Sequence, residues 1–106
     1  MTGCVQAPKP LYYWGNYEQS LYISYSKPEK MSPAQLASNL EEDLSKAAGK
    51  GLKANPGLHA QLGLTYLELG RAEAAMKEFQ TEKELFPESA LFMDRMLEKM
   101  KGGTAK

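Results

Sequence analysis

The sequence is poor in the residues that build reactive centres and has no excess of charge of either sign. Its 106 residues include one cysteine and one histidine, and 13 basic residues balance 13 acidic ones. One cysteine permits no intramolecular disulfide, and one cysteine with one histidine is too few for a self-contained zinc site. Without an excess of positive charge, the chain lacks the usual basis for binding nucleic acid through its phosphates. We therefore expect no metal, no cofactor and no nucleic-acid partner.

Long apolar runs and convergent catalytic side chains are also missing. No apolar run approaches the ~18 residues of a membrane-spanning helix. The acidic run Glu41–Asp43 is consecutive, so its side chains would spread around a helix, and Glu78, Glu82 and Glu84 are likewise expected on a solvated face. His59 is expected to pack against a neighbouring helix, with no nucleophile or acid–base partner around it. We predict that the protein is not an enzyme and has no small-molecule substrate.

What the sequence does have is helical periodicity. Apolar or aromatic residues recur three or four positions apart in five segments, and none alternates as a strand would. We predict an all-α fold, with helices over about 16–26, 33–48, 56–69, 71–86 and 89–101. In the second helix, Ser32 is a good N-cap, Pro33 suits the first position and Gln35 completes a capping box. The predicted organisation is a flexible tether over residues 1–10, one helical domain over 11–101 and a disordered tail over 102–106.

Residues 56–89 carry a pattern that resembles one tetratricopeptide repeat. The matching residues are small where antiparallel helices would approach, large where they would fill the space between them, or placed at turns: Leu62, Gly63, Tyr66, Gly70, Ala75, Phe79 and Pro87. Three positions depart from the repeat: His59, Ala72 and Glu82. The resemblance implies one helix pair, flanked by an N-terminal aromatic helix, a half-unit helix and a C-terminal capping helix, because one repeat cannot bury its own faces.

Two surfaces are candidate partner-binding sites. In the third helix, Ala60, Leu64 and Leu67 form a second apolar stripe, which would line the concave groove of such repeats. Either a neighbouring helix of the same chain covers this stripe, or it stays open as a groove for a partner. The second surface is an aromatic cluster, which either seals the edge of the core or stays exposed to a partner or the membrane interface: Tyr12, Tyr13, Trp14 and Tyr17.

The start of the sequence resembles the end of a bacterial lipobox. Thr2 and Gly3 stand where small residues precede the cysteine that becomes the lipid-bearing N-terminus, and Met1 stands where leucine is usual. We expect a trimmed form of an exported lipoprotein, without its signal peptide and lipidated on Cys4. A free incidental thiol and a buried thiol are the alternatives. Val5 follows where aspartate often retains a lipoprotein at the inner membrane, so the resemblance favours the outer membrane.

The chain resembles a family of small, uncharacterised Gram-negative lipoproteins in three features: this start, the segment LYYWGNYEQSLY and the repeat-like unit. Members of that family are often encoded beside a curli-assembly-type (CsgG-like) lipoprotein. The resemblance runs from Cys4 to about Lys101. It implies a periplasm-facing location at the outer membrane and partnership with another envelope protein, and it implies no reaction. We therefore predict a membrane-anchored, non-catalytic adaptor for protein interactions. The alternative is a soluble cytoplasmic adaptor of the same fold, with Cys4 incidental.

Overall fold

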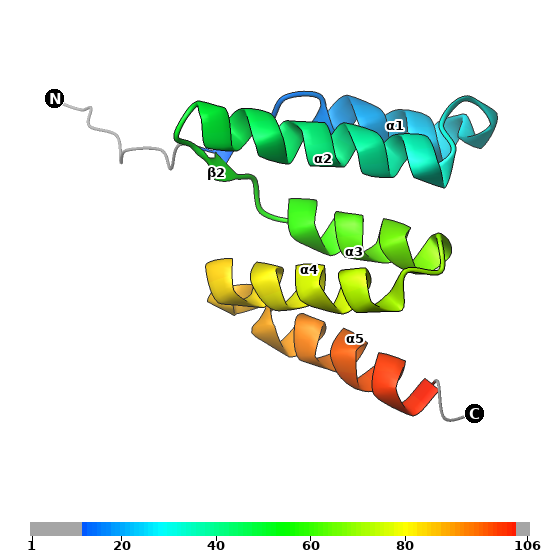
Figure 1. Ribbon diagram of the computed structural model, residues 1–106, viewed down its shortest axis with the longest axis vertical. Coiled ribbons are helices and arrows are strands. Elements are labelled where there is room, and N and C mark those ends of the chain that lie inside the picture. The colour runs from blue at the N-terminus through cyan, green and yellow to red at the C-terminus, as the bar shows by residue number, and fades with distance from the viewer. Residues whose placement is uncertain (1–11, 104–106) are drawn as a thin grey trace, which may run out of the picture.

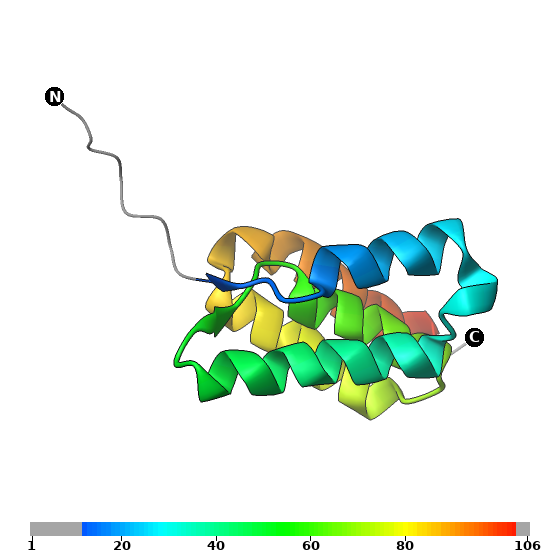
Figure 2. The same cartoon turned by 90° about the horizontal axis from the view of Figure 1, so that it is seen from above.

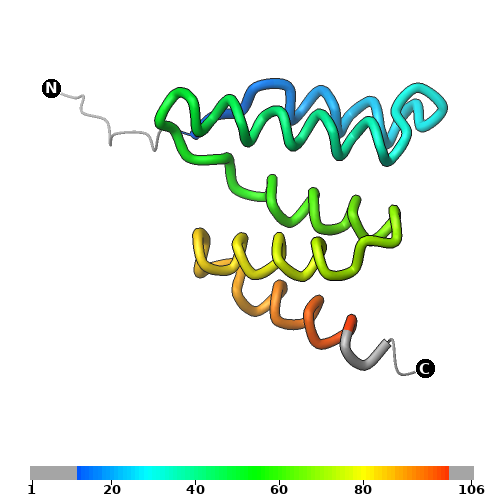
Figure 3. Tube along the Cα trace, viewed as in Figure 1, coloured from blue at the N-terminus to red at the C-terminus, as the bar shows by residue number. Residues whose placement is uncertain are grey.

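The computed structural model describes residues 12–103, with side chains as far as Met100. Its five α-helices are α1 (Tyr17–Ser26), α2 (Pro33–Gly49), α3 (Leu58–Glu68), α4 (Ala72–Leu85) and α5 (Ala90–Gly103). Each helix runs antiparallel to the one before it (Figure 1, Figure 3). Each also packs on its sequence neighbour. The zigzag places α1, α3 and the first half of α5 on one side of the molecule, and α2 and α4 on the other (Figure 2).

The all-α prediction is confirmed, and the five helices lie where the periodicity placed them. The capping box of α2 is present, since Ser32 Oγ accepts from the Gln35 N–H and Gln35 Oε1 accepts from the Ser32 N–H, each at 3.2 Å. The boundary of the C-terminal tail needs correction, because α5 continues through Gly103. Short 3₁₀ turns, η1 (Pro28–Lys30) and η2 (Pro87–Ser89), lead into α2 and α5.

One small element was not predicted. The strand β1 (Tyr12–Tyr13) pairs in parallel with β2 (Lys53–Ala54), which lies in the connection from α2 to α3. Asn55 is fully buried beside this pair and donates from Nδ2 to the Tyr13 carbonyl oxygen at 3.1 Å. A side chain and a two-residue ladder thus attach the start of the described chain to the entrance of α3.

The core is centred on the antiparallel pair α3 and α4. Leu58, Leu62, Ala75 and Phe79 are fully buried between these helices and their neighbours, and Tyr66 is nearly so. Gly70, with a positive φ of 78°, turns the chain between the two helices. Pro87 begins the turn that ends the pair on the other side. The residues predicted to pack the helix pair therefore lie at its interface or at its turns.

Gly63 sets how closely α3 and α4 approach each other. A Cβ atom built on Gly63 would lie 2.5 Å from Cε1 of Phe79, a distance that a real side chain does not reach. Phe79 is fully buried, so its ring has no free space into which to move. The pair can pack at this distance only with glycine at position 63.

We predict that Gly63→Ala destabilises the protein by about 1–3 kcal/mol, the usual cost of overpacking a core. The control is Gly49→Ala, at the end of α2, where an added Cβ meets nothing within 4 Å. There alanine is expected to be neutral or stabilising by up to about 1 kcal/mol, because glycine is the poorer helix former. Urea denaturation followed by circular dichroism measures both changes. Equal effects of the two substitutions would contradict the close approach.

Candidate partner-binding cleft

A cleft with a volume of about 500 Å³ opens between α1, the start of α2 and α3. Its apolar walls come from all three helices and from the turn between α1 and α2: Tyr25, Pro28, Met31, Pro33, Leu36, Leu64 and Leu67. Three polar side chains complete the lining: Ser24, Gln61 and Glu68. Glu68 is the single charged residue among them. Such a site can bury apolar groups and orient them with a few hydrogen bonds.

The predicted second stripe of α3 is divided between the cleft and the core. Leu64 is 37% exposed and lines the cleft. Leu67 also lines it but is half-buried, because it packs against the core as well. Ala60 packs against the core and does not reach the cleft. Part of the stripe therefore packs on the core of the same chain, and the remainder stays open.

The opposite wall of the cleft was missed by the sequence reasoning. The Tyr25 hydroxyl donates to Gln61 Oε1 at 3.2 Å, which links α1 to α3 across the cleft. Tyr25 is nevertheless 70% exposed. Pro28 and Pro33, which bracket the turn into α2, are the sequence signal for a bend at this wall.

The N-terminal aromatic cluster is also divided, and it does not join the cleft. The Tyr12 ring packs edge-on against the buried ring of Phe86, with centroids 5.7 Å apart, so it covers this edge of the core. Trp14 is 43% exposed and leans on Tyr17, with centroids 6.0 Å apart. The Tyr13 ring lies 6.0 Å from the ammonium of Lys50. Tyr12 therefore seals the edge of the core, whereas part of the Trp14 side chain is exposed.

Large exposed apolar side chains occur on several elements. Among the described residues, six of the seven lie on or beside α1, α3 and α5: Trp14, Tyr22, Tyr25, Leu64, Leu91 and Phe92. The seventh, Leu85, ends α4 and is 41% exposed. Of these seven, Tyr25 and Leu64 line the cleft. His59 aside, α1 and α3 carry only Glu18 and Glu68 as charged residues, so the cleft walls that these helices supply suit a protein partner.

Glu82 corrects the expectation of a solvated acidic face on α4. Its side chain is buried, with 2% of the residue exposed. Its Oε2 accepts from the Gly57 N–H at 2.9 Å and its Oε1 accepts from the Ala60 N–H at 3.2 Å. These amides open α3, whose own N-cap, Gly57, offers no side chain. The carboxylate of one helix thus caps the next and interacts with the positive end of its dipole.

Glu78 and Glu41 are also more engaged than predicted, whereas Glu42 and Glu84 are exposed as expected. Glu78 is half-buried, and its Oε1 lies 2.7 Å from Nδ1 of His59. His59 packs in the helix pair as predicted, but the expectation that it has no acid–base partner was wrong. Glu41 accepts from the Tyr66 hydroxyl at 2.5 Å, which joins α2 to α3. Burial and this hydrogen bond both raise the pKa of the Tyr66 phenol. The Tyr17 hydroxyl lies close to Gly57. The pKa of Tyr17 is raised, mainly because the phenol is buried and secondly because of the nearby charge of Glu82.

Asp43 is buried on α2, where a solvated side chain was expected. Its Oδ1 accepts a long hydrogen bond, 3.5 Å, from the Asn16 N–H, and its Oδ2 has no partner among the described residues. Burial is the largest influence and raises the pKa of this carboxyl. The folded state therefore favours the protonated form, so the contribution of Asp43 to stability falls as pH rises through its shifted pKa. The same carboxyl contacts the turn before α1 through Asn16.

Other kinds of site were sought in the described part of the chain. Between residues 12 and 103, no cluster of histidine, cysteine, aspartate or glutamate is arranged to hold a metal ion. No helix described there is both long and apolar enough to cross a membrane. Cys4 and the predicted tether over residues 1–10 lie outside the described residues.

The fold is that of an all-α protein with an apolar cleft between its first three helices. The chain belongs to the family described as domain of unknown function DUF4810, whose model matches residues 11–96. The match covers the cleft, the helix pair and half of α5, so the predicted membership of an uncharacterised family is confirmed. No curated protein and no solved structure matches the chain.

We predict that Glu82→Ala lowers the free energy of unfolding by about 2–3 kcal/mol, because two partly buried amides lose a charged acceptor. Glu84→Ala, two positions along α4 at an exposed site, is the control and should change stability by less than about 0.5 kcal/mol. Urea denaturation measures both values. Amide hydrogen exchange should accelerate at Gly57 and Ala60 in the first variant alone. Unchanged exchange at these two amides would show that Glu82 does not cap α3.

Proposed function

We propose that this protein is a non-catalytic adaptor, held by a lipid on Cys4 at the outer membrane and facing the periplasm, that binds another envelope protein. The observation that carries the proposal is the apolar cleft between α1, α2 and α3, with the exposed side chains of Tyr25 and Leu64 on its walls. A surface of this kind is typical of a site for a protein partner.

The chemistry of the cleft favours a peptide or helix as the bound group. Leu64 and Leu67 offer apolar area on one wall, and Tyr25 and Met31 offer it on the other. Gln61 and Ser24 provide neutral hydrogen-bonding groups, which can fix the orientation of a bound segment without demanding a charge. An amphipathic helix or an extended segment with spaced apolar residues satisfies both requirements.

The helix pair supports the same kind of function. Gly63 and Ala75 let α3 and α4 approach closely, and the resemblance of residues 56–89 to a tetratricopeptide repeat implies a scaffold that presents helix faces to other proteins. The His59–Glu78 pair lies in the helix pair and not in the lining of the cleft, and the described residues hold no metal cluster.

The anchoring part of the proposal is supported by the sequence Thr2-Gly3-Cys4 and by the spacer from Val5 to Pro10. At roughly 3 Å per residue, an extended spacer of this length spans on the order of 20 Å. Acyl chains contribute roughly 0.8 kcal/mol per buried CH₂, and more than one chain gives stable attachment. The spacer leads to β1, next to Trp14, an exposed residue of a type that suits the membrane interface.

We predict that Leu64→Asp lowers recovery of the partner by at least about tenfold, since a buried carboxylate would replace an apolar contact worth about 1.5–3 kcal/mol. The measurement is co-purification from detergent-solubilised envelopes, quantified by mass spectrometry. Leu85→Asp is the matched control, because Leu85 has similar exposure, 41% against 37%, but lies on α4. Equal recovery with both variants, each folded by circular dichroism, would contradict the cleft as the binding site.

A further inference from the structure

The described chain begins with a short arm, residues 12–16, which comes before the first helix. Few contacts hold it in place. Its strand β1 forms a ladder of two residues with β2, and Asn55 Nδ2 donates to the Tyr13 carbonyl oxygen. The Tyr12 ring packs on the edge of Phe86. A segment with so few contacts can open locally while the rest of the fold stays intact.

A buried carboxyl group lies against this arm. Asp43 of α2 is 3% exposed, and its Oδ1 accepts the long hydrogen bond of 3.5 Å from the Asn16 N–H. The same oxygen would lie 2.7 Å from a Cβ atom built on Gly15, so the arm passes directly over it. The second oxygen, Oδ2, is buried and has no partner among the described residues. One weak hydrogen bond is poor compensation for a carboxylate that is removed from water.

The charges around Asp43 do not neutralise it. Burial is the largest influence and raises the pKa of Asp43, and the nearby charge of Glu42 raises it further. Lys46 lowers the pKa, but its ammonium is paired with Glu42 at 3.2 Å. From the arm, the Tyr13 ring lies beside Gly15 together with Asp43 Oδ1. Other titratable groups on or beside the elements packed against α2 form no ion pair or hydrogen bond with Asp43 in the described chain: Tyr17, Glu18, Lys50, Lys53, His59, Tyr66 and Glu68.

We propose that Asp43 is a pH-dependent switch for the arm: residues 12–16 stay docked on α2 while the carboxyl is protonated, and they are released when it ionises. In the docked state, ionisation leaves a buried charge without a cationic partner. Release lets water reach the carboxylate and costs only the few contacts of the arm. Docking and proton binding are therefore linked, so docking is strongest at low pH and weakens as pH rises through the raised pKa of Asp43.

Release of the arm changes what the domain presents. The buried ring of Phe86 loses the cover of Tyr12, and the buried side chain of Asn55 loses its acceptor on Tyr13. The five residues of the arm are added to the predicted tether, a gain of about 15 Å in reach when extended. No residue of the arm lines the cleft, and neither does Asp43, so the switch is independent of the proposed adaptor site.

Trp14 lies in the arm and is the single tryptophan of the chain, so its fluorescence reports release. It is 43% exposed when docked, and the neutral quencher acrylamide should reach it more easily afterwards. We expect the quenching constant to rise, by up to about twofold, between about pH 3.5 and pH 8, a range that starts near the ordinary pKa of aspartate. Circular dichroism should show unchanged helix content throughout. A quenching constant that stays flat in the folded protein overturns the proposal.

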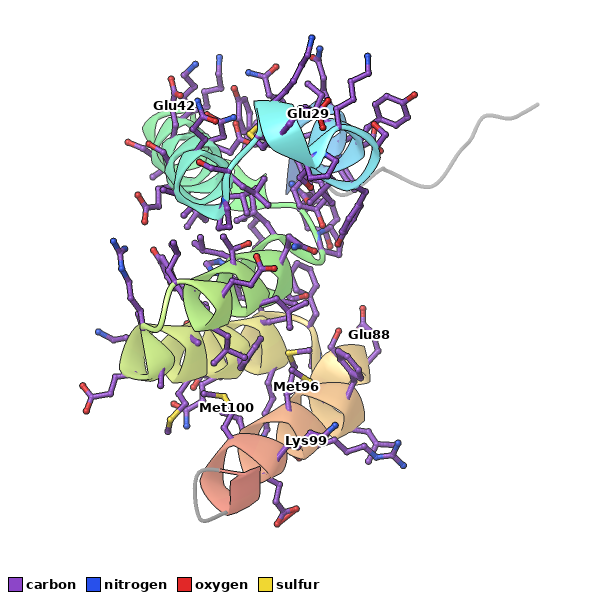
Figure 4. All side chains as sticks on the ribbon, turned by 90° about the vertical axis from the view of Figure 1, so that its right-hand side faces the viewer. Glu29, Glu42, Glu88, Met96, Lys99 and Met100 are labelled. Carbon is purple, nitrogen blue, oxygen red and sulfur yellow. The ribbon has the colours of Figure 1, made fainter. Side chains whose placement is uncertain are left out.

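A matched pair of variants assigns the transition to one carboxyl. Asp43→Asn should keep Trp14 protected at every pH, because a neutral amide of nearly the same size removes the ionisation. The control is Glu42→Gln, since the Glu42 side chain is 59% exposed and lies on the side of α2 that faces away from α3 (Figure 4). This variant should keep the transition, at a slightly lower pH, because Glu42 raises the pKa of Asp43. The parental transition in Asp43→Asn, or its loss in Glu42→Gln, overturns the proposal.

Two further measurements do not depend on the folding of Asp43→Asn. The carboxyl carbon of Asp43, followed by NMR in the parent protein, should titrate with the same midpoint as the quenching of Trp14. Gly15→Ala should release the arm at every pH, because the added Cβ would lie 2.7 Å from Asp43 Oδ1 and the backbone has a φ of 47°. Different midpoints, or protection of Trp14 in folded Gly15→Ala equal to that of the parent at low pH, overturn the proposal.

Discussion

The position of α3 depends on a carboxylate that another helix supplies. Glu82 of α4 accepts from two amides at the start of α3, where Gly57 has no side chain to cap the helix. A buried charge without a cationic partner is costly, and the unsatisfied amides of a helix N-terminus are the group that best offsets that cost. With the close approach of Gly63 to Phe79, this interaction fixes α3 against α4 at two points. Leu64 and Leu67, and with them one wall of the cleft, are placed as a result.

Local pattern was enough to predict the helices and their order, because each helix end has its own signal. The capping box at Ser32 and the turn at Gly70 involve residues that are neighbours in sequence. The features that escaped prediction join distant residues: Gly57 to Glu82 across 25 positions, Asn16 to Asp43 across 27 and Asn55 to Tyr13 across 42. In each case a polar side chain satisfies a backbone group of another element. From its residue type alone, such a side chain is expected to be exposed to solvent. Its hydrogen-bond partner is known only once the helices are packed together.

For the same reason, only one of the two walls of the cleft could be predicted from the sequence. The stripe of Leu64 and Leu67 follows from the spacing within α3, so one wall was visible in the sequence. The other wall depends on the angle at which α1 and its turn cross α3, which no local periodicity encodes. Tyr25 could belong to either face of its helix until that angle was known, and it proves to bridge to Gln61 over the cleft. Ala60 lies one turn before Leu64, near the Glu82 cap, and is held in the core instead.

A binding face and a lipid anchor together make the proposed adaptor, and the anchor at Cys4 is open to the most direct measurement. The protein would be expressed from its full precursor gene in a Gram-negative host and extracted from membranes, and its intact mass determined. A mature chain that begins at Cys4 and carries the added mass of acyl chains is the predicted result. An unmodified Cys4 on a chain recovered in the soluble fraction would contradict the lipid anchor. The protein would then be an adaptor that is not attached to the membrane through Cys4.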